Sequence, residues 1–372
     1  DNKYLDRDFC ENQLELITPV CQSIESLMST LQKLDNSAKT TLLNLGEYIW
    51  LNSNPPHIGS ETDIPIADFD GEQAFKHNYR VNLERRYGKR LMLYSGIHFN
   101  FSFSENLIKS LYDGKGDCKT FKNKLYFRLS KQVLRYSWLL VLLTAASPVY
   151  DLSFDSDGLS GVGFDGYSSM RNSERGYWNQ FVPIIDYTNL STYIDSVNGY
   201  VNKGLLFSAG ELYLPVRLKP HVGSDLNSII ENGVNHIELR MFDLNPLSPL
   251  GVFREDLEFA HYFLIYLLFL PDFEFTPALQ KRAIKNHRHA ARYDLSEITI
   301  NNYSAKEAAL GLLDDMCKYF KDFEQVLKII NIQKNKIIQN ERYCVKVYEK
   351  LAGDFQNKML SLTREYGGAL DV

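Results

Sequence analysis

Residues 236–246 constrain the fold most strongly, because their side chains alternate between two chemical types. The segment reads His236-Ile-Glu-Leu-Arg-Met-Phe-Asp-Leu-Asn-Pro246. Neighbouring side chains of a strand point to opposite faces, so one face carries Glu238 and Arg240 while the other is apolar. This pattern predicts a half-buried β-strand. A charged strand face can simply be solvated, so this segment alone does not establish a site.

Two further segments repeat this alternation. Residues 91–104 form the clearest strand pattern, with phenylalanines on one face and His98 and Asn100 on the other. A lone histidine in a strand is more often structural than a ligand, but this one shares its polar face with Asn100. Residues 211–219 alternate in the same way, and Pro215 among them indicates an edge strand or a bulge.

Residues 8–19 also alternate, with Glu11 and Glu15 on the polar side. A helix is the alternative for this segment, and both interpretations put the two glutamates on a common face. Four half-buried strands predict an α+β fold, in which helices back an antiparallel sheet and a polar cavity lies in front of it.

The composition excludes several classes of protein. With 372 residues and 44% hydrophobic content, the chain can bury a large core, as two domains or as one built on a large sheet. Its 41 basic and 46 acidic residues give a net charge of -5, so we expect small-molecule partners and neither nucleic acid nor a membrane. The apolar runs fall short of the ~20 residues that a membrane span needs. Five scattered cysteines without a CxxC favour a reducing cytoplasm.

A segment rich in Asp, Gly and Ser begins at residue 151 and extends to residue 179, and we interpret it as a lid or substrate loop. Its Asp-Ser-Asp-Gly start does not continue as a calcium-binding EF-hand, because the sixth position is Ser160 and the twelfth is Gly166. Arg171 in this loop could bind a substrate carboxylate. A surface arginine is the alternative.

Carboxylates gathered on one side of a sheet need a positive partner. Glu15 and Glu238 would repel each other unless a cation lay between them. Carboxylates with one imidazole suit Mg²⁺ or Mn²⁺, and an arginine beside such a metal would neutralise charge on a transferred phosphoryl group. The sequence contains no P-loop, Rossmann or G-x-S-x-G motif. These residues therefore predict a metal-dependent enzyme for a phosphate- or carboxylate-bearing substrate.

Five motifs, taken in order, resemble one protein family. They are Asp8-Phe-x-Glu-x-x-Leu-Glu-Leu-Ile-Thr-Pro, Ser95-Gly-Ile-His-Phe-Asn, Ser169-Met-Arg-Asn-Ser-x-x-Gly-Tyr-x-Asn, Pro215-Val-Arg-Leu-Lys and Glu238-Leu-Arg-x-x-Asp-Leu-Asn-Pro. The set resembles the glutamate–cysteine ligases, particularly the N-terminal ligase domain of bifunctional glutathione-synthesising enzymes. The resemblance implies a glutamine-synthetase-like fold and one catalytic domain over residues 1–372, without an ATP-grasp domain.

The resemblance also implies a reaction, the first step of glutathione synthesis. ATP, as co-substrate with Mg²⁺ or Mn²⁺, phosphorylates the γ-carboxylate of glutamate, and the amine of cysteine then attacks the acyl phosphate. We expect a cytoplasmic enzyme that is fused to, or works with, a glutathione synthetase domain.

Individual residues acquire roles from the same resemblance. Four residues match metal-site positions: Asp8, Glu15, His98 and Glu238. Arg240 matches the position beside the transferred phosphate, and Arg171 matches the glutamate-binding arginine. The pocket for the incoming amino acid is matched by Phe9, Tyr79 and Tyr177. Tyr94 stands near the cysteine pocket, where such enzymes tend to carry an aliphatic residue.

Two departures from the family pattern leave alternatives open. The family begins with a Gly-x-Glu-x-Glu strand whose glutamates also bind metal, and nothing before Asp8 supplies it. An inactive or partner-completed binding subunit is therefore one alternative. The aromatic residue at Tyr94 makes a γ-glutamyl ligase for another amine the second alternative.

Overall fold

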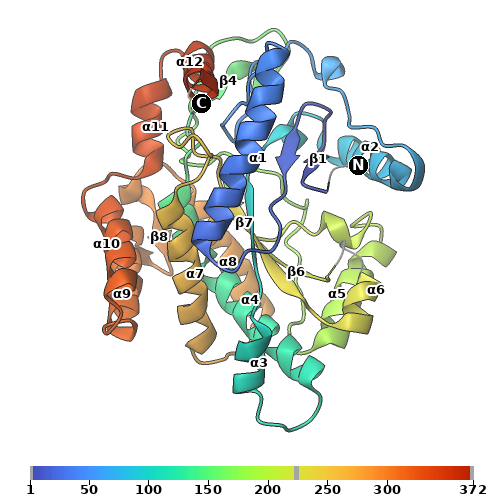
Figure 1. The fold of residues 1–372 in the computed structure, drawn as a ribbon, viewed down its shortest axis with the longest axis vertical. Helices are drawn as coiled ribbons and strands as arrows, with labels where there is room; N and C mark the ends of the chain where they lie inside the picture. The colour runs from blue at the N-terminus through green and yellow to red at the C-terminus, as the bar shows by residue number, and fades with distance from the viewer. Residues whose placement is uncertain (1–2, 222–225, 369–372) are drawn as a thin grey trace.

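A three-stranded antiparallel sheet lies at the centre of the structure (Figure 1). Its central strand is β7 (His236–Phe242), flanked by β3 (Ile97–Phe101) and β6 (Val216–Lys219). The structure is a computed structural model that describes residues 3–221 and 226–368. All three strands lie within segments that the sequence pattern predicts as strands.

The register of this sheet brings the predicted polar residues side by side. Glu238 on β7 lies opposite Asn100 on β3 and opposite Arg217 on β6. On the other face, Ile237 and Leu239 are fully buried in the main core. The prediction of a sheet with one apolar and one polar face is confirmed for these strands.

Helix α4 (Cys118–Thr144) supports the sheet from its apolar side. It contacts β6 and β7 and packs against α7 (Arg254–Phe269) and α8 (Pro277–Ala290). Residues 138–143 of α4 are buried without interruption, which explains why this run is apolar on every face. Across the described ranges, no helix is both long enough and apolar enough to cross a membrane.

The remaining helices surround this core (Figure 1). Helix α1 (Ile24–Asn44) packs against α7, and Gly88 is the C-cap of α2 (Ala74–Tyr87). The others are α3 (Glu105–Leu111), α5 (Leu190–Asn202), α6 (Leu226–Asn232), α9 (Ala305–Tyr319), α10 (Glu324–Ile338), α11 (Tyr343–Leu351) and α12 (Phe355–Gly368). Two short strand pairs complete the fold: β4 (Tyr150–Asp151) with β5 (Val162–Gly163), and β8 (Thr299–Ile300) with β9 (Tyr303–Ser304).

Residues 8–19 do not add a fourth strand to this sheet, so that prediction is wrong. They belong to a separate hairpin, in which β1 (Leu5–Arg7) pairs antiparallel with β2 (Leu14–Leu16). The backbone N–H of Asp8 donates to the carbonyl of Gln13 at 3.0 Å. This bond closes a turn inside the alternating segment, which the period-two pattern cannot reveal.

The turn separates the two glutamates that the sequence places on one face. Glu15 lies on β2, whereas Glu11 lies in the turn and is bound by the guanidinium of Arg7 and the backbone N–H of Asp68. Glu11 is therefore held by the surface of the hairpin, and only Glu15 remains a candidate for the site.

A buried ion pair between α7 and α10 yields a stability prediction. The ammonium of Lys336 lies 2.6 Å from Asp256, and both side chains are less than 10% exposed. Lys336→Ala leaves a buried carboxylate without its cation, so we expect the free energy of unfolding to fall by about 3–5 kcal/mol in urea denaturation.

Lys334→Ala is the matched control on the same helix. Its partner, Asp314, is half exposed, so the loss should stay below about 1 kcal/mol. Equal losses for the two variants would contradict the account of the buried pair.

Candidate functional site

Glu238 and Arg240 form an ion pair on the polar face of β7. Arg240 Nη1 donates to Glu238 Oε1 at 2.6 Å. The ammonium of Lys219 lies 3.4 Å from Glu238 Oε2, and His98 Nδ1 lies 3.9 Å from the same oxygen. Burial disfavours the charge on Glu238, but Arg240, His98 and Lys219 together hold its pKa well below the usual range. The central strand thus carries an ionised, buried carboxylate.

Glu15 lies close enough to Glu238 for the two carboxylates to repel each other, and Asp8 is a further acidic neighbour of Glu15. Burial raises the pKa of Glu15 to about 7, and the neighbouring carboxylates of Asp8, Asp6 and Glu238 contribute to the rise. Burial also raises the pKa of Asp8, against the effect of Arg80. Both side chains keep solvent-exposed surface.

The four predicted metal-binding residues are near one another but do not converge. Within residues 3–221 and 226–368, no three His, Cys, Asp or Glu side chains come together as a metal site would require. Glu238 is held by Arg240, while Glu15 experiences repulsion from its acidic neighbours. Oxygen donors that repel one another fit a hard divalent cation, so the metal site stays a prediction.

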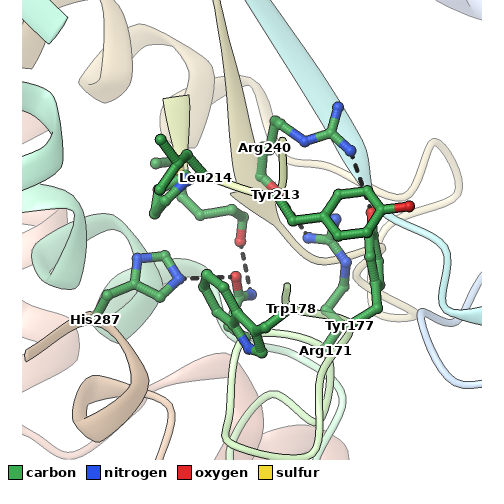
Figure 2. A pocket seen from close by; sticks show the side chains of 10 residues that line it. Arg171, Tyr177, Trp178, Tyr213, Leu214, Arg240 and His287 are labelled. Carbon is green, nitrogen blue, oxygen red and sulfur yellow. Dashed lines mark hydrogen bonds between the residues drawn. The ribbon is translucent and has the colours of Figure 1, made fainter. Parts of the chain in front are cut away.

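A pocket opens beside Arg240 (Figure 2). Arg240 Nη2 donates to the hydroxyl of Tyr177 at 3.3 Å, and the ring of Tyr177 meets that of Tyr213 edge-on at 5.0 Å. Figure 2 shows His287 and Trp178 across the pocket from these residues. The full lining consists of Arg171, Asn172, Tyr177, Trp178, Tyr213, Leu214, Pro215, Arg240, Met241 and His287.

Arg171 also lines this pocket, and it is fixed to the backbone of β7. Its Nη1 donates to the carbonyl oxygens of Arg240 at 2.9 Å and Phe242 at 3.0 Å. The residue is only 6% exposed, which excludes the alternative of a surface arginine. The guanidinium lies directly over Gly96, where a Cβ atom would be 2.3 Å from Arg171 Cζ. Glycine is required there because the two groups are in contact.

The aromatic residues predicted for the amino-acid pocket gather in one cluster. Phe9 and Tyr94 are buried in it, and Tyr79 and Tyr177 pack against it. In the described part of the chain, Tyr177 is the member of this group that lines the pocket beside Arg171. Tyr94 packs on the ring of Phe154 at 4.8 Å, and burial raises the pKa of its hydroxyl.

The sequence analysis assigns no role to two residues of the site, Asp243 and His287. Asp243 is 2% exposed and accepts hydrogen bonds from the backbone of Ala146 and from the hydroxyls of Ser147 and Ser169. Burial raises its pKa despite these bonds. Asp243 lies inside the last of the five motifs, whereas His287 lies in none of them, so no motif signals its role.

The arrangement has a definite chemical capacity. Arginine side chains bind oxygen anions well, and Arg171 and Arg240 line the same pocket. The carboxylates of Glu15 and Glu238 lie near Arg240. A pocket that contains two guanidinium groups is suited to a small anionic ligand.

The chain belongs to the glutamate–cysteine ligase family, because the model of that family matches residues 1–290. It is 38% identical over 367 residues to the glutathione biosynthesis bifunctional protein GshAB of Listeria monocytogenes, in a match that spans 92% of this chain and 47% of that protein. The protein of the same name from Clostridium perfringens is 37% identical over 299 residues, which are 77% of this chain and 38% of the relative. The chain thus spans about half the length of the curated relatives it matches, or less.

Two solved structures share the fold. A glutamate–cysteine ligase from Francisella tularensis, crystallised in complex with AMP, matches with a TM-score of 0.88 and 23% identity over 98% of this chain and 82% of its own. A bifunctional glutathione synthetase from Pasteurella multocida matches with a TM-score of 0.84 and 24% identity, over 98% of this chain and 48% of its own. These likenesses establish the mixed architecture of helices and antiparallel sheet.

The contact between Gly96 and Arg171 predicts a sharp steric effect. Gly96→Ala must displace the guanidinium, so we expect the free energy of unfolding to fall by about 1–3 kcal/mol. Gly59→Ala is the control, since a Cβ atom there meets nothing within 4 Å, and it should change stability by less than about 0.5 kcal/mol. Urea denaturation measures both, and an unchanged Gly96→Ala variant would contradict the observed packing.

The buried imidazole of His287 predicts a pH dependence of stability. Burial lowers its pKa to about 3, with Arg288 and Arg171 adding to the effect. Because the folded-state pKa lies below the unfolded value near 6.5, this contribution to stability is complete above pH 6.5 and is lost as the pH falls toward 3.

The size of this effect is measurable with one variant. Between pH 7 and pH 5, the wild type should lose about 2 kcal/mol more unfolding free energy than His287→Gln. Parallel losses in the two proteins would show that His287 is not buried in its neutral form.

Proposed function

We propose that this chain ligates the γ-carboxylate of L-glutamate to the amine of L-cysteine at the expense of ATP, the first step of glutathione synthesis. The observation that carries the proposal is the pairing of Arg171 and Arg240 in one pocket beside the Glu238 carboxylate. Membership of the glutamate–cysteine ligase family and the names of the relatives support it. Because the chain spans about half of those relatives, the activity is a proposal for this chain.

The reaction proceeds in two balanced steps. A γ-carboxylate oxygen of glutamate attacks the γ-phosphorus of ATP, and ADP leaves with the electrons of the broken P–O bond. The amine of cysteine then attacks the acyl carbon of γ-glutamyl phosphate, phosphate leaves, and the nitrogen loses a proton. Both steps develop negative charge on oxygen, which fixed cations stabilise.

Arg240 and Arg171 have separate roles in this scheme. The guanidinium of Arg240 is held by hydrogen bonds to Glu238 and to the hydroxyl of Tyr177. Its fixed positive charge would therefore face the phosphoryl group during transfer. Arg171 binds a carboxylate of glutamate, because its guanidinium lies in the pocket lining and is fixed to β7 on its other side. The aromatic group of Phe9, Tyr79, Tyr94 and Tyr177 borders the space for the incoming amino acid.

Asp8, Glu15, His98 and Glu238 would hold Mg²⁺ or Mn²⁺. A bound divalent cation would relieve the repulsion that raises the pKa of Glu15 and would neutralise the phosphates of ATP. Glu238 must then turn part of its carboxylate away from Arg240.

Further features extend the proposal. We regard the fold as a glutamine-synthetase-like variant, with the polar sheet face as the active-site cavity and residues 1–372 as one catalytic domain. The five cysteines are free thiols, which supports a reducing cytoplasmic setting. The bifunctional relatives support a partner activity, fused or separate, that converts γ-glutamylcysteine to glutathione.

The substrate test measures phosphate release from ATP. We expect release to require glutamate and an amine together, with cysteine preferred over a panel of other amino acids. Equal rates with another amine would favour the alternative γ-glutamyl ligase, for which Tyr94 beside Phe154 is the motivating residue. Absence of any amine-dependent release would contradict the proposal.

A charge-removing variant tests the role of Glu238. Glu238→Gln keeps the shape of the side chain but removes the anion that faces Arg240, Lys219 and the metal, so kcat/KM should fall by roughly 10²-fold. Glu258→Gln, at an exposed pair on α7, is the control and should match the wild type. Full activity in Glu238→Gln would contradict the assignment of Glu238 as a metal ligand.

A further inference from the structure

His287 lies at the far side of the pocket and connects two distant segments. The residue sits in the last turn of α8 and is 1% exposed. Its Nδ1 lies 2.9 Å from the hydroxyl of Ser137 on α4. Its Nε2 lies 3.2 Å from the side-chain oxygen of Asn172, and this bond is the dashed line at His287 in Figure 2. One imidazole therefore bridges the supporting helix layer and the loop that carries Arg171.

The bonds around Asn172 fix the tautomer of this imidazole. The amide nitrogen of Asn172 donates to the carbonyl oxygen of Met241 at 2.9 Å and to the hydroxyl of Ser169 at 2.9 Å. The amide oxygen is left to face His287, so it must accept a hydrogen bond from Nε2. Nδ1 then carries no hydrogen and faces the hydroxyl of Ser137, whose single hydrogen is shared between Nδ1 and the carbonyl oxygen of Leu134. A neutral ring protonated at Nε2 satisfies the amide oxygen of Asn172.

Asn172 and Arg171 are neighbours in sequence and bind successive carbonyl groups of β7. Arg171 binds the carbonyls of Arg240 and Phe242, and Asn172 binds the carbonyl of Met241 that lies between them. The side chains of Arg171 and Asn172 are therefore anchored to the same three residues of β7. The loop is already tight, since a Cβ atom at Gly176 would lie 1.9 Å from the carbonyl oxygen of Arg171.

We propose that His287 is a positioning residue that orients Arg171 for glutamate through its hydrogen bond to Asn172. This inference rests on the proposed function for the identity of the ligand, but the bond network stands on geometry alone. His287 also meets the indole of Trp178 edge-on at 5.3 Å, and the guanidinium of Arg288 covers the same indole at 4.5 Å. Two residues of α8, His287 and Arg288, therefore hold the indole of Trp178 on the side of the pocket opposite Arg240.

The kinetic test compares substitutions that keep or remove the hydrogen bond. His287→Phe keeps an aromatic ring beside Trp178 but cannot donate to Asn172, so the KM for glutamate should rise about tenfold while the KM for ATP stays within twofold. His287→Gln can donate from its own Nε2 and should restore the KM for glutamate to within about threefold of the wild type. His289→Phe makes the same change two residues along α8, outside the pocket lining, and should leave both constants unchanged.

The outcomes separate positioning from simple structural support. A His287→Phe variant with a lowered melting temperature and an unchanged KM for glutamate would overturn the proposal, as would equal increases in both KM values. Failure of the proposed function is seen separately, as a wild type without turnover that depends on glutamate and cysteine.

A second measurement needs neither activity nor a stable variant. Nitrogen-15 NMR of the wild-type imidazole should show the neutral form protonated at Nε2 at pH 7. A ring protonated at Nδ1 would overturn the inferred bond to Asn172.

Discussion

The ion pair between Glu238 and Arg240 is the interaction on which the rest of the site depends. Removing two charges from water is costly, and a buried pair is retained only where other groups complete its environment. Here Lys219 and His98 complete the environment of Glu238, and Tyr177 accepts a hydrogen bond from Arg240. The pair places an ionised carboxylate next to one arginine of the pocket on the central strand.

The backbone of the same strand organises the second arginine. Arg240 of β7 lines the pocket, while the carbonyl groups at residues 240, 241 and 242 bind Arg171 and Asn172. Strand β7 therefore sets the distance between the guanidinium groups of Arg171 and Arg240. Helix α4 packs against β7, and α8 packs against α4.

The sequence predicts those parts of this arrangement that depend on local periodicity. Alternation at period two identifies β3, β6 and β7 and assigns Glu238 and Arg240 to the polar face, because burial of one sheet face imposes that period. It fails for residues 8–19, where a turn bond between Asp8 and Gln13 breaks a segment that still alternates. It also cannot detect His287, since the partners of this residue, Ser137 and Asn172, are more than 100 positions away in the chain.

The family resemblance assigns roles to single residues, which periodicity cannot do. At Arg171 and Tyr94 the structure adds information that the resemblance does not contain. Arg171 could have been a surface arginine, and only the contact with Gly96 and the bonds to β7 remove that alternative. Tyr94 belongs to the aromatic cluster and packs on Phe154 within it, and its place near a cysteine pocket stays a prediction. The choice of amine is therefore the part of the proposal that depends most on experiment.

The central claim is that the γ-carboxylate of glutamate attacks ATP beside Arg240. The most direct measurement uses glutamate labelled with oxygen-18 in its γ-carboxylate, together with ATP, Mg²⁺ and cysteine, and determines the isotope content of the released phosphate by mass spectrometry. The account predicts one labelled oxygen in each phosphate formed. Phosphate without the label would contradict the account, because its oxygen would then come from water and no acyl phosphate would lie on the reaction path.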